Sequence, residues 1–175
     1  MARACGSFQL VTDFVVEAIT AAMTRPMRQR ILRPHQAVEL LVYPHDDDVD
    51  TLHAGAFVGE TLVGTATVHR QPPPASHFPT HALDPSAWRL RGMTTVPEMR
   101  RQGCGAALVA ACFAHAEERG GTLVWCNARV TAASFYASLG FAPHGDAFEL
   151  PEIGAHFVMS KIISRSRRST AAPRM

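Results

Sequence analysis

The sequence lacks the marks of a membrane-spanning or secreted protein. No apolar run approaches the roughly 20 residues that cross a bilayer, so we expect no transmembrane helix. Residues 1–10 contain neither the apolar segment nor the cleavage pattern of a signal peptide, which directs secretion. We therefore expect a cytoplasmic protein.

Cysteine is scarce, and no two cysteines form a C-x-x-C pair. The four thiols stand far apart, at Cys5, Cys104, Cys112 and Cys126. Zinc ligands usually come in closely spaced pairs, so this pattern argues against a metal site. Disulfides are not expected in a reducing compartment either. We expect small buried thiols and no metal.

Acidic residues are absent from the C-terminal end. The chain carries a net charge of +2, and residues 161–175 contain five basic residues and no acid, which leaves −3 on the rest. We expect residues 164–175 to form a disordered, solvated tail, with a nucleic-acid arm as the alternative. Acids gather instead at 46–50, which we interpret as a solvated loop, or alternatively as an attractor for a cationic amine.

What is present is an alternation of strand and helix patterns. β-rich runs predict strands at 14–19, 51–58, 61–69, 88–95, 122–126 and 155–163. Helical spacing predicts helices at 103–119 and at about 131–139, and a first helix that begins at Thr20 or Thr24, carries Pro26 in its first turn and ends at Arg33. This order indicates an α/β (α+β) fold with a mixed sheet. The domain spans 13–163, preceded by an extension at 1–12.

One segment carries the clearest chemistry, a strand that runs through a turn with two glycines into a long helix. Backbone N–H groups at a helix start have no intrahelical partner, so they can bind an anion. Gly103 and Gly105 allow close approach of a phosphate, and Arg100 and Arg101 add positive charge. The alternative is a turn without a ligand. Two other phosphate loops are excluded, because no Gly-Lys-Ser/Thr follows and Leu108 occupies the third glycine position of G-x-G-x-x-G.

Two motifs resemble a known family. Residues 100–105, RRQGCG, resemble the R/Q-x-x-G-x-G/A signature of the GNAT acetyltransferases, and residues 134–141, SFYASLGF, resemble that family's F-Y-x-x-L-G-F helix. The resemblance covers about residues 13–163. It implies the GNAT fold, in which helices lie on both faces of a mixed sheet and two splayed strands bind acetyl-CoA as cosubstrate.

The resemblance also implies roles for particular residues. The pantetheine arm would pair with the strand at 93–95, the pyrophosphate would lie on the loop amides, and Tyr136 would protonate the departing thiolate, unless it is a core aromatic. Arg129 stands where many members have Asn. The implied cofactor-binding residues are Met93, Thr94, Thr95, Arg100, Arg101, Gln102, Gly103, Cys104, Gly105, Ala106, Asn127 and Arg129. The positive field of this loop would lower the pKa of Cys104.

An attacking amine must also lose a proton. Glu149 is our first candidate for the base because it falls between the second motif and the last strand, and His156 is the second; Glu98 and His53 qualify by residue type. The alternatives are a surface carboxylate and a structural histidine.

Together these features predict an enzyme that transfers an acetyl group from acetyl-CoA to a primary amine by direct attack. The acceptor is a small molecule or a protein amine, and a second copy of the chain is a further candidate partner. The alternatives are a non-catalytic acyl-CoA-binding module of the same fold, or a nucleic-acid-associated protein that uses its basic tail.

Overall fold

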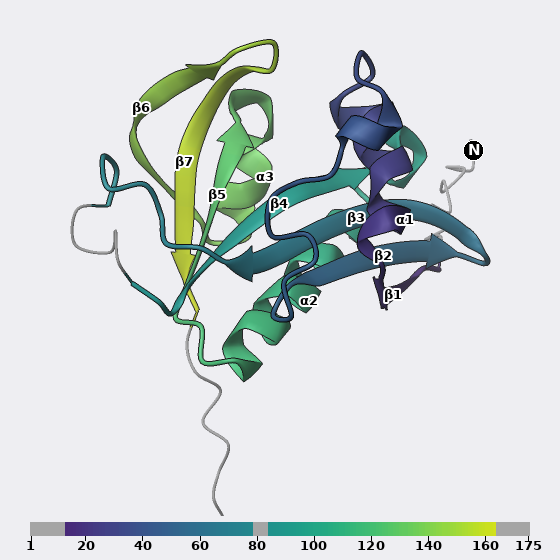
Figure 1. Cartoon of the computed structure of the whole chain (residues 1–175), viewed down its shortest axis with the longest axis horizontal. Helices are drawn as coiled ribbons and strands as arrows, with labels where there is room; N and C mark the ends of the chain where they lie inside the picture. Colours follow the sequence, from purple (N-terminus) through teal and green to yellow (C-terminus); the bar gives the residue numbers. More distant parts are fainter. Residues whose placement is uncertain (1–12, 79–83, 164–175) are drawn as a thin grey trace, which may run out of the picture.

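The computed structural model describes residues 13–78 and 84–163 (Figure 1). The N-terminal extension and the basic tail therefore lie outside the described residues, and so do the expectations for them. No helix in the described ranges is both long and apolar enough to cross a membrane.

Seven strands form one sheet in the order β1-β2-β3-β4-β5-β7-β6. All neighbours are antiparallel except β4 and β5, which are parallel. The strands are β1 (Val15–Ile19), β2 (Leu52–Val58), β3 (Thr61–Arg70), β4 (Ala87–Thr95), β5 (Leu123–Arg129), β6 (Ala142–Leu150) and β7 (Gly154–Ile162). The sheet is thus mixed, as the sequence predicts.

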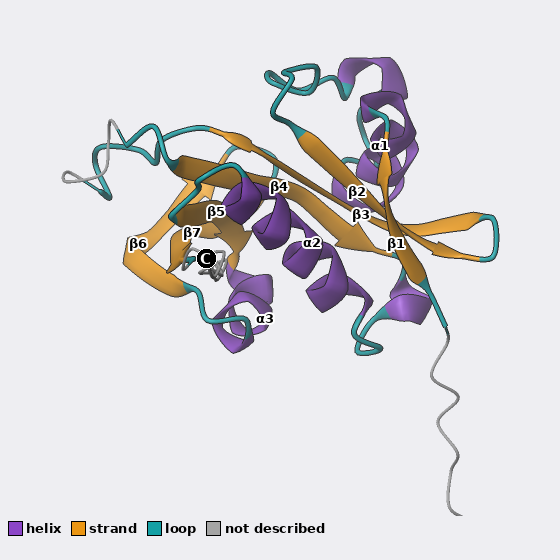
Figure 2. Cartoon of the chain, turned by 90° about the horizontal axis from the view of Figure 1, so that it is seen from below, coloured by secondary structure: helices purple, strands orange, loops and turns teal. Residues whose placement is uncertain are grey.

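Helices cover both faces of this sheet (Figure 2). α2 and α3 lie on one face, and α1 with the π-helical turn η1 lies on the other. Their bounds are α1 (Ala21–Met27), η1 (Arg28–Leu32), α2 (Cys104–Glu118) and α3 (Ala133–Ser138), and short 3-10 turns occur at η2 (Val38–Leu40), η3 (Pro97–Met99) and η4 (Val130–Ala132).

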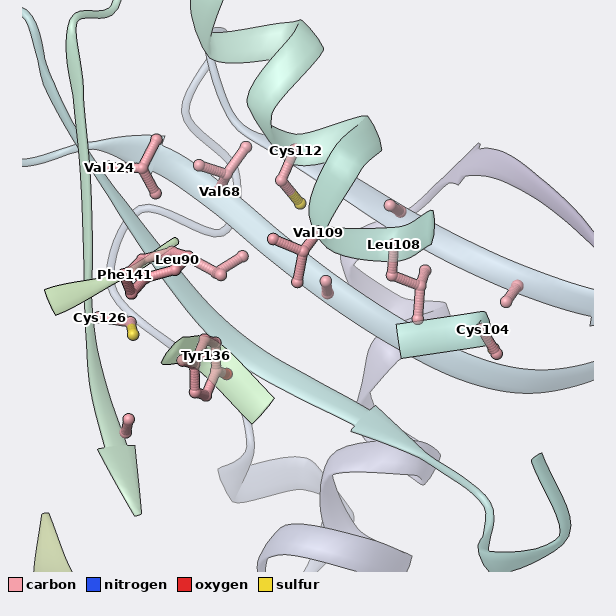
Figure 3. Packing of buried hydrophobic residues seen from close by; sticks show 14 of the residues in the cluster. Val68, Leu90, Cys104, Leu108, Val109, Cys112, Val124, Cys126, Tyr136 and Phe141 are labelled. Carbon is pink, nitrogen blue, oxygen red and sulfur yellow. The ribbon is translucent and has the colours of Figure 1, made fainter. Parts of the chain in front are cut away.

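The core lies between α2 and the sheet (Figure 3). Leu108, Val109 and Cys112 of α2 are fully buried, and they share one cluster with Val68 and Leu90 of the strands. Because side chains of a strand alternate between its two faces, the residues next to Leu90 on β4 belong to the opposite face. Arg89 and Arg91 therefore extend from β4 away from α2.

The sheet divides between β4 and β5. The two strands pair only through Ala87–Leu123, Trp88–Val124 and Arg89–Trp125. Beyond these three pairs, β5, β7 and β6 turn away from the first four strands (Figure 1), so the edge of β4 from Leu90 to Thr95 pairs with no described strand on that side. This is the splayed pair that the resemblance to the GNAT family implies.

A β-bulge bends the unpaired half of β4. Thr65 faces Thr94 and Thr67 faces Arg91, so one residue of β3 lies opposite two residues of β4, the first of which is Gly92 with φ +60°. A bulge of this kind increases the local twist of a strand, and here it lies where β4 leaves β5.

Two sequence predictions about the elements are wrong. β6 was not predicted; it is an edge strand, mostly exposed, with Pro143 and Gly145 and a register shift, so its sequence does not alternate clearly. Pro26 does not lie in a first helical turn, because Thr20 caps α1 and Pro26 falls near its end. Proline has no N–H for the helical ladder, and the chain continues as the π-helical turn η1.

Candidate active site

The split between β4 and β5 opens into a cavity with a volume of about 930 Å³. Eight of the cofactor-binding residues predicted from sequence line this cavity, and so does Tyr136, the predicted proton donor. The eight are Met93, Thr94, Thr95, Arg100, Arg101, Gly105, Asn127 and Arg129. The other predicted residues do not line it: Gln102, Gly103, Cys104, Ala106 and Glu149. The structure therefore brings the two sequence motifs to one cavity.

The turn before α2 has an unusual backbone. Gly103 is its N-cap, with φ +84°, and Arg101 also has a positive φ of +62°. Successive residues that depart from the right-handed region can aim neighbouring N–H groups at one point, where an anion binds. The side-chain amide of Gln102 donates to the carbonyl of Glu98 at 2.6 Å and so holds the turn from outside the cavity.

Gly105 lies in the first turn of α2 against the second motif. A Cβ at this position would stand 3.2 Å from the ring of Phe135 on α3. The absence of a side chain at Gly105 therefore lets α2 and α3 approach each other at the cavity wall.

Cys104 is not activated by the loop. Its side chain is fully buried, and burial raises the pKa of the Cys104 thiol. The prediction that the local field lowers this pKa is wrong, because the side chain is buried in the hydrophobic core cluster. Cys112 and Cys126 are buried as well, and burial raises the pKa of each to about 12.

Tyr136 lies at the inner wall of the cavity. Only 6% of the residue is exposed, and its ring packs edge-on against Phe135 and Phe141. Burial raises the pKa of the Tyr136 phenol, so it stays protonated at neutral pH. The residue lines the cavity. Tyr136 is thus a core aromatic whose protonated phenol lines the cavity.

Two polar groups at the cavity lack a protein partner. Thr94 Oγ1 and Asn127 Oδ1 are buried and have no hydrogen bond within the described part of the chain. A buried polar atom without a partner costs free energy comparable to a lost hydrogen bond. These two atoms stand on either side of the split, on β4 and β5, where a polar ligand would satisfy both.

The acidic loop is not fully solvated, which corrects the sequence interpretation. Asp46 is buried, and its carboxylate accepts from both terminal nitrogens of Arg28, at 2.5 and 2.9 Å, and from Arg91 at 3.0 Å. Burial alone would raise the pKa of Asp46, but its hydrogen bonds with Arg28 and with the backbone N–H of Tyr43 hold the pKa below its usual value. An acid already paired in this way does not attract a cationic amine.

Two arginines at the cavity were missed by sequence reasoning. Arg89 and Arg91 extend from β4 to the face opposite α2, and both line the cavity. Arg89 stacks over Trp125 at 4.9 Å, and Arg91 stacks over Tyr43 at 5.2 Å. The signal was available: in the run Trp88-Arg89-Leu90-Arg91, apolar and charged residues alternate, which marks a strand with one charged face.

The candidate bases differ in whether they line the cavity. Glu149 is exposed on β6 and does not line the cavity, whereas His156 on β7 does. His156 Nδ1 donates to the carbonyl of Gly154 at 2.7 Å, which leaves Nε2 as an acceptor. His53 bonds to Thr67 and to the carbonyl of Asp46 through its two ring nitrogens, a structural arrangement, and Glu98 lies at a second, smaller pocket.

Comparison with known proteins agrees with the geometry. Residues 16–141 match the Acetyltransferase (GNAT) family. A relative from Bacillus subtilis (strain 168), named "Uncharacterized N-acetyltransferase YitI", is 38% identical over 152 residues, which are 87% of this chain and 98% of that protein.

Solved structures share the fold. Ard1 from Thermoplasma volcanium has a TM-score of 0.68 at 15% identity, over 86% of this chain and 98% of that one. An aminoglycoside 6'-N-acetyltransferase complexed with coenzyme A has a TM-score of 0.61 at 14% identity, also over 86% and 98%. At these identities the likeness concerns the fold alone, and it confirms the fold that the two motifs predicted.

Proposed function

This chain belongs to the GNAT acetyltransferase family, and on that basis we propose that it transfers an acetyl group from acetyl-CoA to a primary amine by direct attack, without an acyl-enzyme. The observation that carries the proposal is the meeting of three features at one cavity. These are the unpaired edge of β4, the N-terminus of α2 and the buried phenol of Tyr136.

The residues present fit acetyl-CoA. Met93, Thr94 and Thr95 lie on the part of β4 that pairs with no described strand on the side of the split. Thr94 Oγ1 can donate or accept and Asn127 Oδ1 can accept, and both are buried without a hydrogen-bond partner among the described residues. When bound, the cofactor supplies an activated acyl group as a thioester.

The phosphates would lie at the N-terminus of α2. Here the first N–H groups of the helix have no intrahelical partner, and Arg100 and Arg101 line the same end of the cavity. The backbone of residues 101–106 would bind the pyrophosphate, even where the side chain points away, as at Cys104. Asn127 and Arg129 would contact the arm from β5.

Tyr136 would act as the general acid. A phenol that is fully protonated and buried next to the thioester can neutralise the thiolate as its charge develops. Its neighbours Cys112 and Cys126 stay protonated thiols because burial raises their pKa, so neither competes as an anion.

We propose His156 as the group that accepts the proton of the attacking amine, directly or through a water. Its tautomer leaves Nε2 free to accept, and the residue lines the cavity. Glu149, which sequence position favours, is exposed and outside the lining, so it ranks second.

The test is a binding measurement followed by an activity screen. Calorimetry should give a Kd for acetyl-CoA in the micromolar range, a usual scale for such enzymes, and a screen of amines should release free thiol from acetyl-CoA. Binding without thiol release from any amine would favour the non-catalytic binding module. Absence of binding to the folded protein would overturn the cofactor site itself.

A further inference from the structure

The cavity is positive at both ends, but only one end can serve the cofactor. Its lining contains six arginines and one histidine, and among the described residues no Asp or Glu lines it. The arginines are Arg33, Arg89, Arg91, Arg100, Arg101 and Arg129. Arg100 and Arg101 lie at the turn before α2, where the phosphates of acetyl-CoA are proposed to bind.

Arg89 and Arg91 stand too far along β4 from the turn before α2 to reach those phosphates. Because of the bulge at Gly92, Arg91 and Arg89 pair with β3 residues three and five positions from the partner of Thr95. At about 3.3 Å per residue, they stand about 10 Å and about 17 Å from Thr95 along the sheet, and the turn follows Thr95. The charges of acetyl-CoA are all on its nucleotide phosphates, whereas its pantetheine arm and thioester are neutral. The positive charge of Arg89 and Arg91 therefore has no counterpart in the cofactor.

The protein itself compensates only part of this charge. Arg28 and Arg91 share the single carboxylate of Asp46, which leaves a net charge of +1 in that group. Arg89 has no carboxylate partner within the described residues. Its Nη1 donates to Gln71 Oε1 at 3.3 Å, and its Nε is buried without a hydrogen bond.

A buried guanidinium without an anion is costly. Burial lowers the pKa of Arg89, and burial lowers that of Arg91 to about 10 despite Asp46. His69 is buried beside them and hydrogen-bonded to Gln71, and an imidazole is either neutral or cationic, so it supplies no negative charge. Both guanidinium groups remain charged at neutral pH, and the cavity is the open side from which an anion can reach them.

From this geometry we propose that the amine acceptor carries an oxyanion, a carboxylate or a phosphate, which Arg89 and Arg91 bind at the inner end of the cavity. This inference rests on the proposed acetyl transfer and specifies its acceptor. The arginine fork suits both oxyanions. Polyamines and aminoglycosides, which are multiply cationic, are disfavoured because the lining would repel them.

The first experiment compares matched amines with the full-length protein, by thiol release from acetyl-CoA. The panel pairs each amino acid with its C-terminal amide and phosphoethanolamine with ethanolamine, and it adds spermidine and kanamycin. We expect the best substrate to bear an oxyanion and to exceed its neutral counterpart at least about 10-fold in kcat/KM. The two sets of pairs distinguish carboxylate from phosphate. A best substrate that bears no oxyanion would overturn the proposal.

The second experiment tests the residues. Arg89→Gln should raise KM for the oxyanion substrate at least about 10-fold, but it should not lower kcat/KM for the neutral counterpart. If Arg89 had a purely structural role, its substitution would lower kcat/KM equally for the two substrates, and that result would overturn the assignment. Arg30→Gln is the matched control, because Arg30 is exposed and does not line the cavity. Arg91→Gln provides a second variant if Arg89→Gln does not fold.

A third readout needs no turnover, so it separates this proposal from the proposed function. Each panel amine is added without acetyl-CoA, and the rise in melting temperature reports its binding to the folded protein. Oxyanion-bearing amines should raise the melting temperature of the wild type and of Arg30→Gln, but not of Arg89→Gln. If spermidine or kanamycin stabilises instead, or if no oxyanion-bearing amine does, the acceptor proposal fails while acetyl-CoA binding stands or falls by its own titration.

Discussion

The two ends of the cavity are built in different ways. The turn before α2 comes from consecutive residues, 100–106, whose backbone forms the proposed phosphate site. The opposite end brings together Arg28 of η1, Asp46 of the following loop, and Arg89 and Arg91 of β4. The first end is a local structure, whereas the second exists only after the whole sheet has folded. We therefore expect changes at the first end to affect ligand binding, and changes at the second to affect stability as well.

The largest expected effect is on stability, at Asp46. Asp46→Asn removes the carboxylate that two buried guanidinium groups share, and an uncompensated buried charge costs about 3–5 kcal/mol. Denaturant unfolding should show a loss of this size. Asp48→Asn is the control, because Asp48 is exposed and pairs only with exposed His45, so its loss should stay below about 1 kcal/mol. Equal effects of the two variants would mean that the buried network does not hold the second end together.

The next effect is on catalysis, at Tyr136. Tyr136→Phe keeps the ring contacts with Phe135 and Phe141 but removes the hydroxyl. Turnover at saturating acetyl-CoA should fall about 100-fold, since general acid catalysis contributes at least that factor, while calorimetry should show nearly unchanged affinity for acetyl-CoA. A fall below about threefold in turnover would return Tyr136 to a packing role only.

A smaller effect on cofactor affinity is expected at Gly103. A Cβ at residue 103 would meet no described atom within 4 Å, but Gly103→Val forces a β-branched residue to φ +84° and covers backbone that the phosphates are proposed to approach. We expect acetyl-CoA binding to weaken at least about 10-fold. Gly59→Val is the control, because it also strains a positive φ, of +57°, in a hairpin turn away from the cavity. If both variants bind acetyl-CoA like the wild type, the turn is not the phosphate site.

The smallest expected effect is a pH dependence of the folding stability, caused by His69 at the end of the cavity formed by Arg89 and Arg91. Burial lowers the pKa of His69 to about 4; its hydrogen bond to Gln71 opposes this shift, and the nearby charges of Arg91 and Arg89 add to it. The folded state therefore keeps His69 neutral where the unfolded chain, with a pKa near 6.5, takes up a proton. The stability is fully present above pH 6.5 and is lost as pH falls toward 4.

Between pH 7.5 and 5.5 this histidine should account for a loss of about 1 kcal/mol in the free energy of unfolding. The measurement is the difference between wild type and His69→Gln at each pH, which removes the contributions of other groups. Parallel pH profiles for the two proteins would contradict the assignment.

The sequence predicted the first end of the cavity better than the second for a physical reason. The turn at 100–106, the helix after it and the position of Tyr136 depend on local patterns, and the structure brings them to one cavity as expected. The pairing of Asp46 depends on contacts with Arg28, 18 residues away, and Arg91, 45 residues away. A run of three aspartates indicates a solvated loop when it is read locally, because the sequence pattern does not reveal contacts with distant residues.

The remaining errors have the same origin. β6 is an exposed edge strand whose Pro143 and Gly145 conceal it in sequence, yet it carries Glu149 away from the cavity. Arg89 and Arg91 looked like ordinary charged residues, because the strand alternation alone does not say which face borders a cavity.

We propose that one cavity holds acetyl-CoA at the α2 end and an amine at the other, with Tyr136 between them. To test this arrangement, the full-length protein is incubated with acetyl-CoA and the amine panel, and both products are followed by mass spectrometry. We expect one amine to gain an acetyl group in step with an equal amount of free coenzyme A, and we expect Tyr136→Phe to slow both products alike. Release of coenzyme A without any acetylated amine, or no product from a protein that binds acetyl-CoA, would contradict it.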